Sequence, residues 1–121
     1  MTLERLRETC LGLPGTTEQI QWGADLVFKV GGKMFCVACT EPGPDTVALS
    51  FKCDPDRFAE LVEREGIRPA PYLARAKWVA LDRFDTLPPR ELSALIENAY
   101  ALVVARLPKQ AQRALAQPPK A

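Results

Sequence analysis

Two hydrophobic patterns share this chain, one with the spacing of a helix and one with the alternation of a strand. Apolar residues three and four positions apart predict helices over residues 2–11, 54–66 and 88–107. Each of these segments begins at a Thr, Asp or Pro that favours a helix start, and each stops at Gly or Pro. The pattern therefore predicts three helices separated by other structure.

Between the helices, apolar and polar residues alternate in short runs. Strands are expected over residues 25–30, 33–38, 47–52 and 78–81, with a further short strand at residues 20–22. The order helix, strands, helix, strand, helix is typical of an α+β domain. We expect an antiparallel sheet with helices packed on one face.

A glycine pair, Gly31 and Gly32, predicts a tight hairpin turn between the first two long strands. A two-residue turn pairs Val30 with Lys33, Phe28 with Phe35 and Leu26 with Val37. The covered face then carries Leu26, Phe28, Val30, Phe35 and Val37. The opposite face carries Asp25, Val27, Lys29, Met34, Cys36 and Ala38.

The uncovered face of such a sheet is predicted to hold Lys29, Ser50, Lys52 and Trp78. Trp78 lies there because Val79 and Leu81 point into the core on the other side. A large indole away from the core indicates either a binding surface or a cover supplied by the loop over residues 67–72. Trp22, which precedes Gly23, is interpreted as a core or edge anchor.

Length and composition indicate how many domains the chain can form and where in the cell it is expected. With 121 residues, 47% of them hydrophobic, the chain can bury a single core, which we place in residues 1–108. Residues 109–121 are rich in Ala, Gln and Pro and carry bases but no acid, so they are expected to be a frayed helix or disordered. No apolar run is long enough to span a membrane and no signal peptide opens the chain, so we expect a cytoplasmic protein.

The charged residues nearly balance, because 16 Lys and Arg stand against 15 Asp and Glu. Any binding of nucleic acid must therefore come from a local patch rather than from net charge. Histidine is absent, which excludes Ser-His-Asp and Cys-His nucleophiles and the common histidine-containing metal sites. We expect no catalytic residues and hence no enzyme.

No phosphate-binding glycine motif is present, and we expect no cofactor. Cys36 and Cys39 have the spacing of a metal or redox motif, but residues three apart on a strand point to opposite faces. The four cysteines, which include Cys10 and Cys53, are expected to be free and largely buried, and no metal site is expected.

Long bases and aromatic side chains gather around the last predicted strand. Bases of this kind contact phosphate oxygens, and aromatic rings stack on nucleobases. The candidate nucleic-acid-binding residues are Lys29, Lys52, Arg68, Tyr72, Arg75, Lys77 and Trp78. The alternative is that the bases merely keep an exposed sheet in solution.

An ordered set of short motifs resembles the MmcQ/YjbR family of small bacterial proteins over nearly the whole chain. The set comprises Leu13-Pro14-Gly15, Trp22-Gly23, the hairpin at residues 28–35, Lys52 with Asp54-Pro55, residues 68–73, Lys77-Trp78-Val79 and Leu107-Pro108-Lys109. The resemblance implies an α+β fold of the double-wing, or frataxin-like, type and a role in binding DNA. A frataxin-like iron site would need an acidic first helix, whereas Glu4 and Glu8 alternate here with Arg5 and Arg7.

Two functions stay open at this point. The leading hypothesis is a non-enzymatic DNA-binding protein that uses the open sheet face, with single- or double-stranded DNA undecided. The alternative is a protein-interaction or small-ligand module in which Trp78 and Tyr72 line a shallow pocket.

Overall fold

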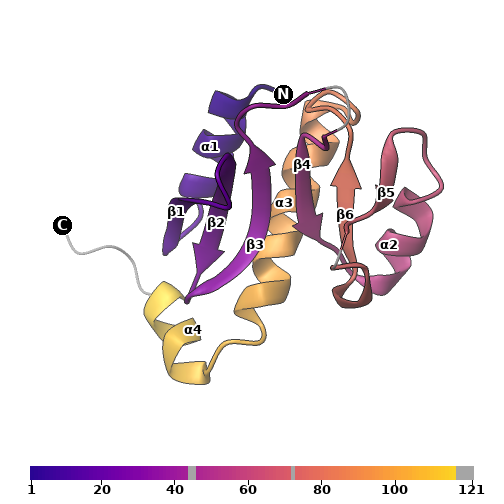
Figure 1. Ribbon diagram of the computed structural model, residues 1–121. Coiled ribbons are helices and arrows are strands. Elements are labelled where there is room, and N and C mark those ends of the chain that lie inside the picture. Colours follow the sequence, from indigo (N-terminus) through magenta and orange to yellow (C-terminus); the bar gives the residue numbers. More distant parts are fainter. Residues whose placement is uncertain (44–45, 72, 117–121) are drawn as a thin grey trace.

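A computed structural model describes residues 1–43, 46–71 and 73–116. Within these ranges, six strands form one antiparallel sheet in the order β1-β2-β3-β4-β6-β5, and helices cover one of its faces (Figure 1). The elements are α1 (Leu3–Leu11), β1 (Thr16–Gln21), β2 (Asp25–Val30), β3 (Lys33–Cys39), β4 (Leu49–Lys52), α2 (Pro55–Leu61), β5 (Ile67–Pro69), a 3₁₀ turn η1 (Ala74–Ala76), β6 (Trp78–Leu81), α3 (Pro89–Val104) and α4 (Lys109–Ala116). The predicted α+β class and the one-sided packing of the helices are confirmed.

The first two helices begin where their capping residues place them. The Thr2 hydroxyl accepts a hydrogen bond from the Arg5 N–H at 3.2 Å, and the Asp54 carboxylate accepts one from the Arg57 N–H at 2.9 Å. These bonds satisfy N–H groups that have no partner inside a helix. The second helix ends at Leu61, five residues earlier than the sequence pattern predicts.

The strands differ from the prediction at both edges of the sheet. Strand β1 begins at Thr16 rather than at Ile20, and Trp22 lies outside it in a turn. Strand β5 was not predicted, because its three residues are too few to show an alternating pattern. Both are edge strands, where a polar sequence such as that of β1 is ordinary.

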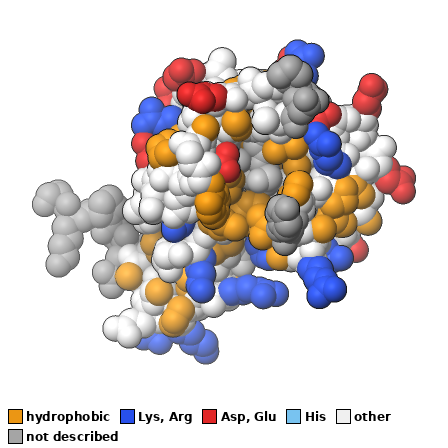
Figure 2. Space-filling model, in the orientation of Figure 1, with side chains coloured by type: hydrophobic (Ala, Val, Ile, Leu, Met, Phe, Trp, Pro, Cys, Tyr) orange, Lys and Arg blue, Asp and Glu red, His pale blue; other side chains and the backbone are white. Residues whose placement is uncertain are grey.

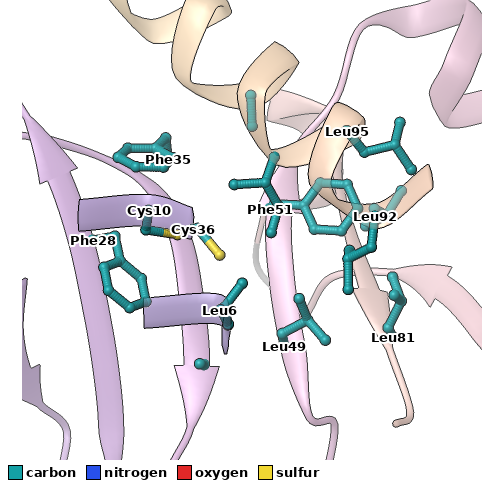
Figure 3. Close-up of a cluster of buried hydrophobic side chains, with 14 of the residues drawn as sticks. Leu6, Cys10, Phe28, Phe35, Cys36, Leu49, Phe51, Leu81, Leu92 and Leu95 are labelled. Atoms are coloured by element: carbon teal, nitrogen blue, oxygen red, sulfur yellow. The ribbon is translucent and has the colours of Figure 1, made fainter. Parts of the chain in front are cut away.

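The main core lies between the sheet and α3, which crosses behind the middle strands (Figure 1). Figure 3 shows Phe28, Phe35 and Phe51 from the strands meeting side chains of α1 and α3. Cys10 of α1 and Cys36 of β3 lie next to each other in this core (Figure 3). Cys10, Cys36 and Cys53 are buried and Cys39 is half-buried, and all four are free thiols.

A β-bulge in β3 overturns part of the predicted hairpin register. Val30 pairs with Lys33 as expected, but Phe28 pairs with Cys36 and not with Phe35. Phe35 is thus an extra residue, and every later residue of β3 faces the side opposite to the prediction. Cys36 and Ala38 join the core beneath the helices, whereas Val37 lies on the open face.

The bulge also limits how far the two halves of the sheet stay together. Strand β3 pairs with β4 only through Cys36, Val37 and Ala38, so its first residues have no partner on β4. A bulged strand bends, and here the bend separates Lys33 and Met34 from the end of β4. An opening between the two halves of the sheet follows from this separation.

Beyond α3, the predicted tail contains a helix that contacts the rest of the protein. Ala111 and Leu115 of α4 are half-buried and pack against the main core. Residues 117–121, the end of the predicted tail, lie outside the described residues. No helix in the described ranges is both long and apolar enough to cross a membrane.

Candidate functional site

The open face of the sheet carries the four residues predicted for it. Lys29 pairs with Met34, Ser50 with Ala80, and Lys52 with Trp78. Directly paired residues of antiparallel strands share a face. Trp78, Ala80 and Ala70 form a small buried cluster with Met34, Val37, Val47 and Leu73, separate from the main core. The predicted side for these residues is confirmed.

Of the two interpretations left open for Trp78, an exposed binding surface or a ring covered by the loop over residues 67–72, the structure shows the covered ring. Its side chain is only 3% exposed, because Ala70 and Leu73 of the connection after β5 cover it together with Met34. A ring buried to this degree has no free face on which a base could stack. Trp78 is therefore part of the floor of the open face.

A basic hollow lies where β3 leaves β4. Its cavity measures about 400 Å³ and is lined by Lys33, Met34, Lys52, Trp78, Val103, Arg106 and Leu107. The Lys52 ammonium donates a hydrogen bond to the Ala76 carbonyl at 3.0 Å. Partial burial lowers the pKa of Lys52, and the nearby Arg106 guanidinium lowers it further. Positive charges are thus held close together in the hollow.

The bases of the hollow have no acidic partner, unlike several arginines elsewhere in the described ranges. Arg7, Arg64, Arg68 and Arg83 each form an ion pair with a carboxylate at 2.8 Å or less. Within the described ranges, no carboxylate oxygen lies within 4.0 Å of the charged groups of Lys33, Lys52 or Arg106. The charge of this hollow is therefore available to an anion.

Three predicted site residues lie away from the basic hollow or are already engaged. Arg68, on β5, pairs with Asp82 at 2.7 Å. The Lys77 ammonium lies 5.1 Å from the centre of the Phe58 ring of α2, and so points toward the helical side. Arg75 is exposed on η1.

Of the other predicted residues, Lys29 is half-buried on β2 and Lys52 lies in the basic hollow. Tyr72 lies outside the described residues. The sequence prediction thus identified one of the three bases that line the hollow.

A second concave region, the apolar cleft, lies on the same face. Its cavity measures about 480 Å³ and is lined by Trp22, Asp25, Met34, Val37, Ser50, Pro71 and Leu73. Met34 borders both regions, so the cleft and the basic hollow are neighbours. Figure 2 shows hydrophobic side chains across the middle of this face and Lys and Arg below them.

Trp22 was predicted to be a core or edge anchor, and this prediction is wrong. Its side chain is 69% exposed and its backbone adopts a left-handed conformation with φ of 51°. Bulky residues avoid this region, since their Cβ crowds the following carbonyl. The turn before Asp25 thus holds a large ring in solvent at a conformational cost.

Asp25 is the acidic residue of the cleft. Desolvation raises the pKa of its carboxyl group, because the surrounding apolar walls withhold water from the charged form. Among the described residues, no hydrogen bond or ion pair engages this carboxylate. The cleft therefore offers an acceptor group at a surface that is apolar apart from Ser50.

Sequence reasoning missed Lys33, Arg106, Trp22 and Asp25 as site residues. Lys33 follows the Gly31-Gly32 turn and Arg106 follows α3, so each is a base at the end of an element, where side chains from separate elements meet. Trp22 beside Gly23 carried a usable signal, because an aromatic residue in a tight turn has little room to be buried. Within the described ranges, no group of three or more Cys, Asp or Glu is arranged to hold a metal ion.

Comparisons with known proteins place the chain in a family. The YjbR family model matches residues 11–102. A crystal structure of a Deinococcus radiodurans protein with the DUF419 domain superposes with a TM-score of 0.82 at 31% identity, covering 97% of this chain and 89% of that one. A Pseudomonas syringae protein of 20% identity has the same fold, with a TM-score of 0.67 over 84% of this chain and 98% of its own. No curated protein matches the chain. The extent of the family match and the agreement of the fold show that the chain belongs to the YjbR family.

Proposed function

We propose that this protein binds DNA without catalysing a reaction, and that the basic hollow contacts the phosphate backbone. The observation that carries the proposal is the set of bases without acidic partners at Lys33, Lys52 and Arg106. Like charges held together disfavour the free protein slightly, and an anion relieves that repulsion. Phosphate oxygens are the acceptors that Lys and Arg recognise in nucleic acids.

The shape of the open face favours a single strand over a duplex. The two neighbouring cavities measure about 400 and 480 Å³, which is within the range of small-molecule sites. A single strand can turn individual bases into such concave regions, whereas a duplex keeps its bases stacked inside. Trp22 takes the aromatic role that was expected of Trp78, because its ring is the exposed indole of this face.

Lys29 and Arg75 are expected to make further phosphate contacts outside the hollow, since neither forms an ion pair among the described residues. Arg68 and Lys77 contribute less, because Asp82 and the Phe58 ring already engage them. With the three bases of the hollow, about five phosphate contacts result, for which affinity falls steeply with salt.

The test is a titration of the full chain with labelled single-stranded and double-stranded DNA of mixed sequence at several salt concentrations, followed by fluorescence anisotropy. We expect tighter binding of the single strand and a slope of log affinity against log salt of about −3.5, from roughly five contacts at 0.7 each. Absence of binding at micromolar protein and low salt would overturn the proposal.

A second function, a small-ligand module without a role in nucleic acid binding, is favoured by the apolar cleft. The nearly balanced charge of the chain also suits this alternative, since it supplies no general attraction to a polyanion. Binding of small apolar molecules that depends on Trp22 and ignores salt, together with no binding of DNA, would establish it in place of the first.

A further inference from the structure

The apolar cleft has a composition that matches one kind of chemical group. Met34, Val37 and Leu73 supply apolar surface, Trp22 an exposed aromatic ring, and Asp25 a carboxylate. Flat aromatic heterocycles with hydrogen-bond donors on one edge fit such a surface, because the ring stacks while the edge donates to the acid. Nucleobases are heterocycles of this kind.

Conformational cost at Trp22 is a second, independent observation. A left-handed backbone costs an L-residue free energy, and the 69% exposed ring recovers little of it by burial. Strain of this kind is common where a side chain is held ready for a ligand. The turn between β1 and β2 thus presents an indole next to the carboxylate that begins β2.

The carboxylate of Asp25 discriminates among the bases by its chemistry. An ionised carboxylate only accepts hydrogen bonds, and it accepts two best from parallel donors. Guanine presents two adjacent donors, N1–H and N2–H, on its pairing edge. Adenine and cytosine present one amino group beside an acceptor nitrogen, and thymine presents one N–H between two carbonyl groups, which repel a carboxylate.

The position of the cleft agrees with this assignment. Met34 borders both the cleft and the basic hollow, so one nucleotide can place its base in the first and its phosphate at the second. The Asp25 carboxylate is half-buried in the wall of the cleft, which shields part of it from water. A carboxylate on a DNA-binding surface repels phosphate. Here it would instead accept hydrogen bonds from a base and so distinguish one base from another.

We infer that the apolar cleft binds a guanine base, with Trp22 stacked on the ring and the Asp25 carboxylate accepting hydrogen bonds from N1–H and N2–H. This inference rests on the proposed function, because the guanine is taken to belong to the bound DNA strand. The base site itself is also testable with a free nucleotide.

The first arm of the experiment uses short oligothymidylates with one central guanine, adenine or hypoxanthine. Hypoxanthine lacks only the 2-amino group of guanine. Binding is followed by anisotropy and by tryptophan emission, and Trp22→Phe assigns the emission change to Trp22 rather than to buried Trp78. We expect guanine to be preferred over hypoxanthine by about tenfold, the scale of one good bidentate contact.

Asp25→Asn is expected to remove this preference, while its effect on overall affinity stays small. The matched control is Asp56→Asn, which removes an exposed acid from the first turn of α2 and should leave the preference intact. Equal affinity for guanine and hypoxanthine, or a guanine preference that persists in Asp25→Asn, would overturn the inference.

The second arm uses guanosine monophosphate and inosine monophosphate in place of DNA. Strand binding that depends on salt but shows no base preference would leave the proposed function standing and overturn the inference. A change in Trp22 emission with guanosine monophosphate that requires Asp25, without any strand binding, would support the base site and overturn the proposed function. No response to nucleotide or strand would overturn both.

Discussion

The two concave regions of the open face are similar in size and opposite in charge. The basic hollow measures about 400 Å³ and brings together Lys33, Lys52 and Arg106, whereas the apolar cleft of about 480 Å³ contains Asp25 as its charged residue. They share Met34. The first lies where the bulge at Phe35 bends β3 away from β4, and the second lies beside the turn that exposes Trp22.

This difference shows how one sheet face can orient a ligand. A basic surface alone attracts any polyanion and selects nothing, since phosphates are the same in every sequence. An acidic group beside it repels phosphate and accepts hydrogen bonds from bases. A strand bound across both regions would therefore place its backbone at the hollow and a base at the cleft.

Removal of Trp78 should disturb both concave regions at once. Its ring forms part of the hollow and packs against Met34, which borders both regions. Trp78→Ala is expected to lower the free energy of unfolding by about 3 kcal/mol, since a large buried ring leaves a cavity. Urea denaturation measures the loss. A change below about 1 kcal/mol would contradict the burial of this ring.

Substitution of Trp22, in contrast, should not lower the free energy of unfolding. Trp22→Asn places a residue that tolerates the left-handed region at φ of 51°, while little packing is lost from an exposed ring. Stability is expected to stay the same or to rise by up to about 1 kcal/mol. The same urea experiment applies, and destabilisation as large as that of Trp78→Ala would show that Trp22 is a structural anchor after all.

Asp25→Asn should change how the stability of the protein depends on pH. The pKa of Asp25 is raised in the folded state by desolvation, so the stability that this group contributes is present below its ordinary pKa of 3.8 and lost as pH rises through the raised value. Relative to the wild type, Asp25→Asn should therefore gain stability between acidic and neutral pH. Denaturation midpoints measured across this range test the direction, and a constant difference between the two proteins would contradict it.

The smallest expected effect concerns Lys52. Its pKa is lowered first by desolvation and second by Arg106, so Arg106→Gln should raise it part of the way toward 10.5. Because the folded pKa lies below the unfolded one, stability from this group increases as pH rises between the two values. NMR titration of the Lys52 side chain measures the shift, and an unchanged pKa would place Arg106 too far away to share an anion.

Much of the fold could be predicted because local signals and tertiary structure agree. Thr2 and Asp54 cap helices as their types predict, and alternation placed Lys29, Lys52 and Trp78 on the correct side of the sheet. The bulge at Phe35 could not be predicted, since hairpin rules assume continuous pairing and one extra residue reverses every later side chain of β3.

The candidate site was harder to predict than the fold. Alternation gives the face of Trp78 but cannot decide between an exposed ring and one covered by residues 67–72, because Ala70 and Leu73 lie in a connection without periodicity. Arg106 reaches the hollow only because the end of α3 meets the opening left by β3. Contacts of this kind depend on how elements pack, which no local pattern in one sequence records.

One pair of double variants shows whether the basic hollow binds a nucleic-acid backbone. Lys52→Gln with Arg106→Gln removes two charges from the hollow, and Arg57→Gln with Arg90→Gln removes two exposed charges from α2 and α3. We expect the salt slope for single-stranded DNA to flatten by about 1.4 in the first variant, which is 0.7 for each lost contact, and to stay unchanged in the second. Equal slopes in the two variants would contradict the account.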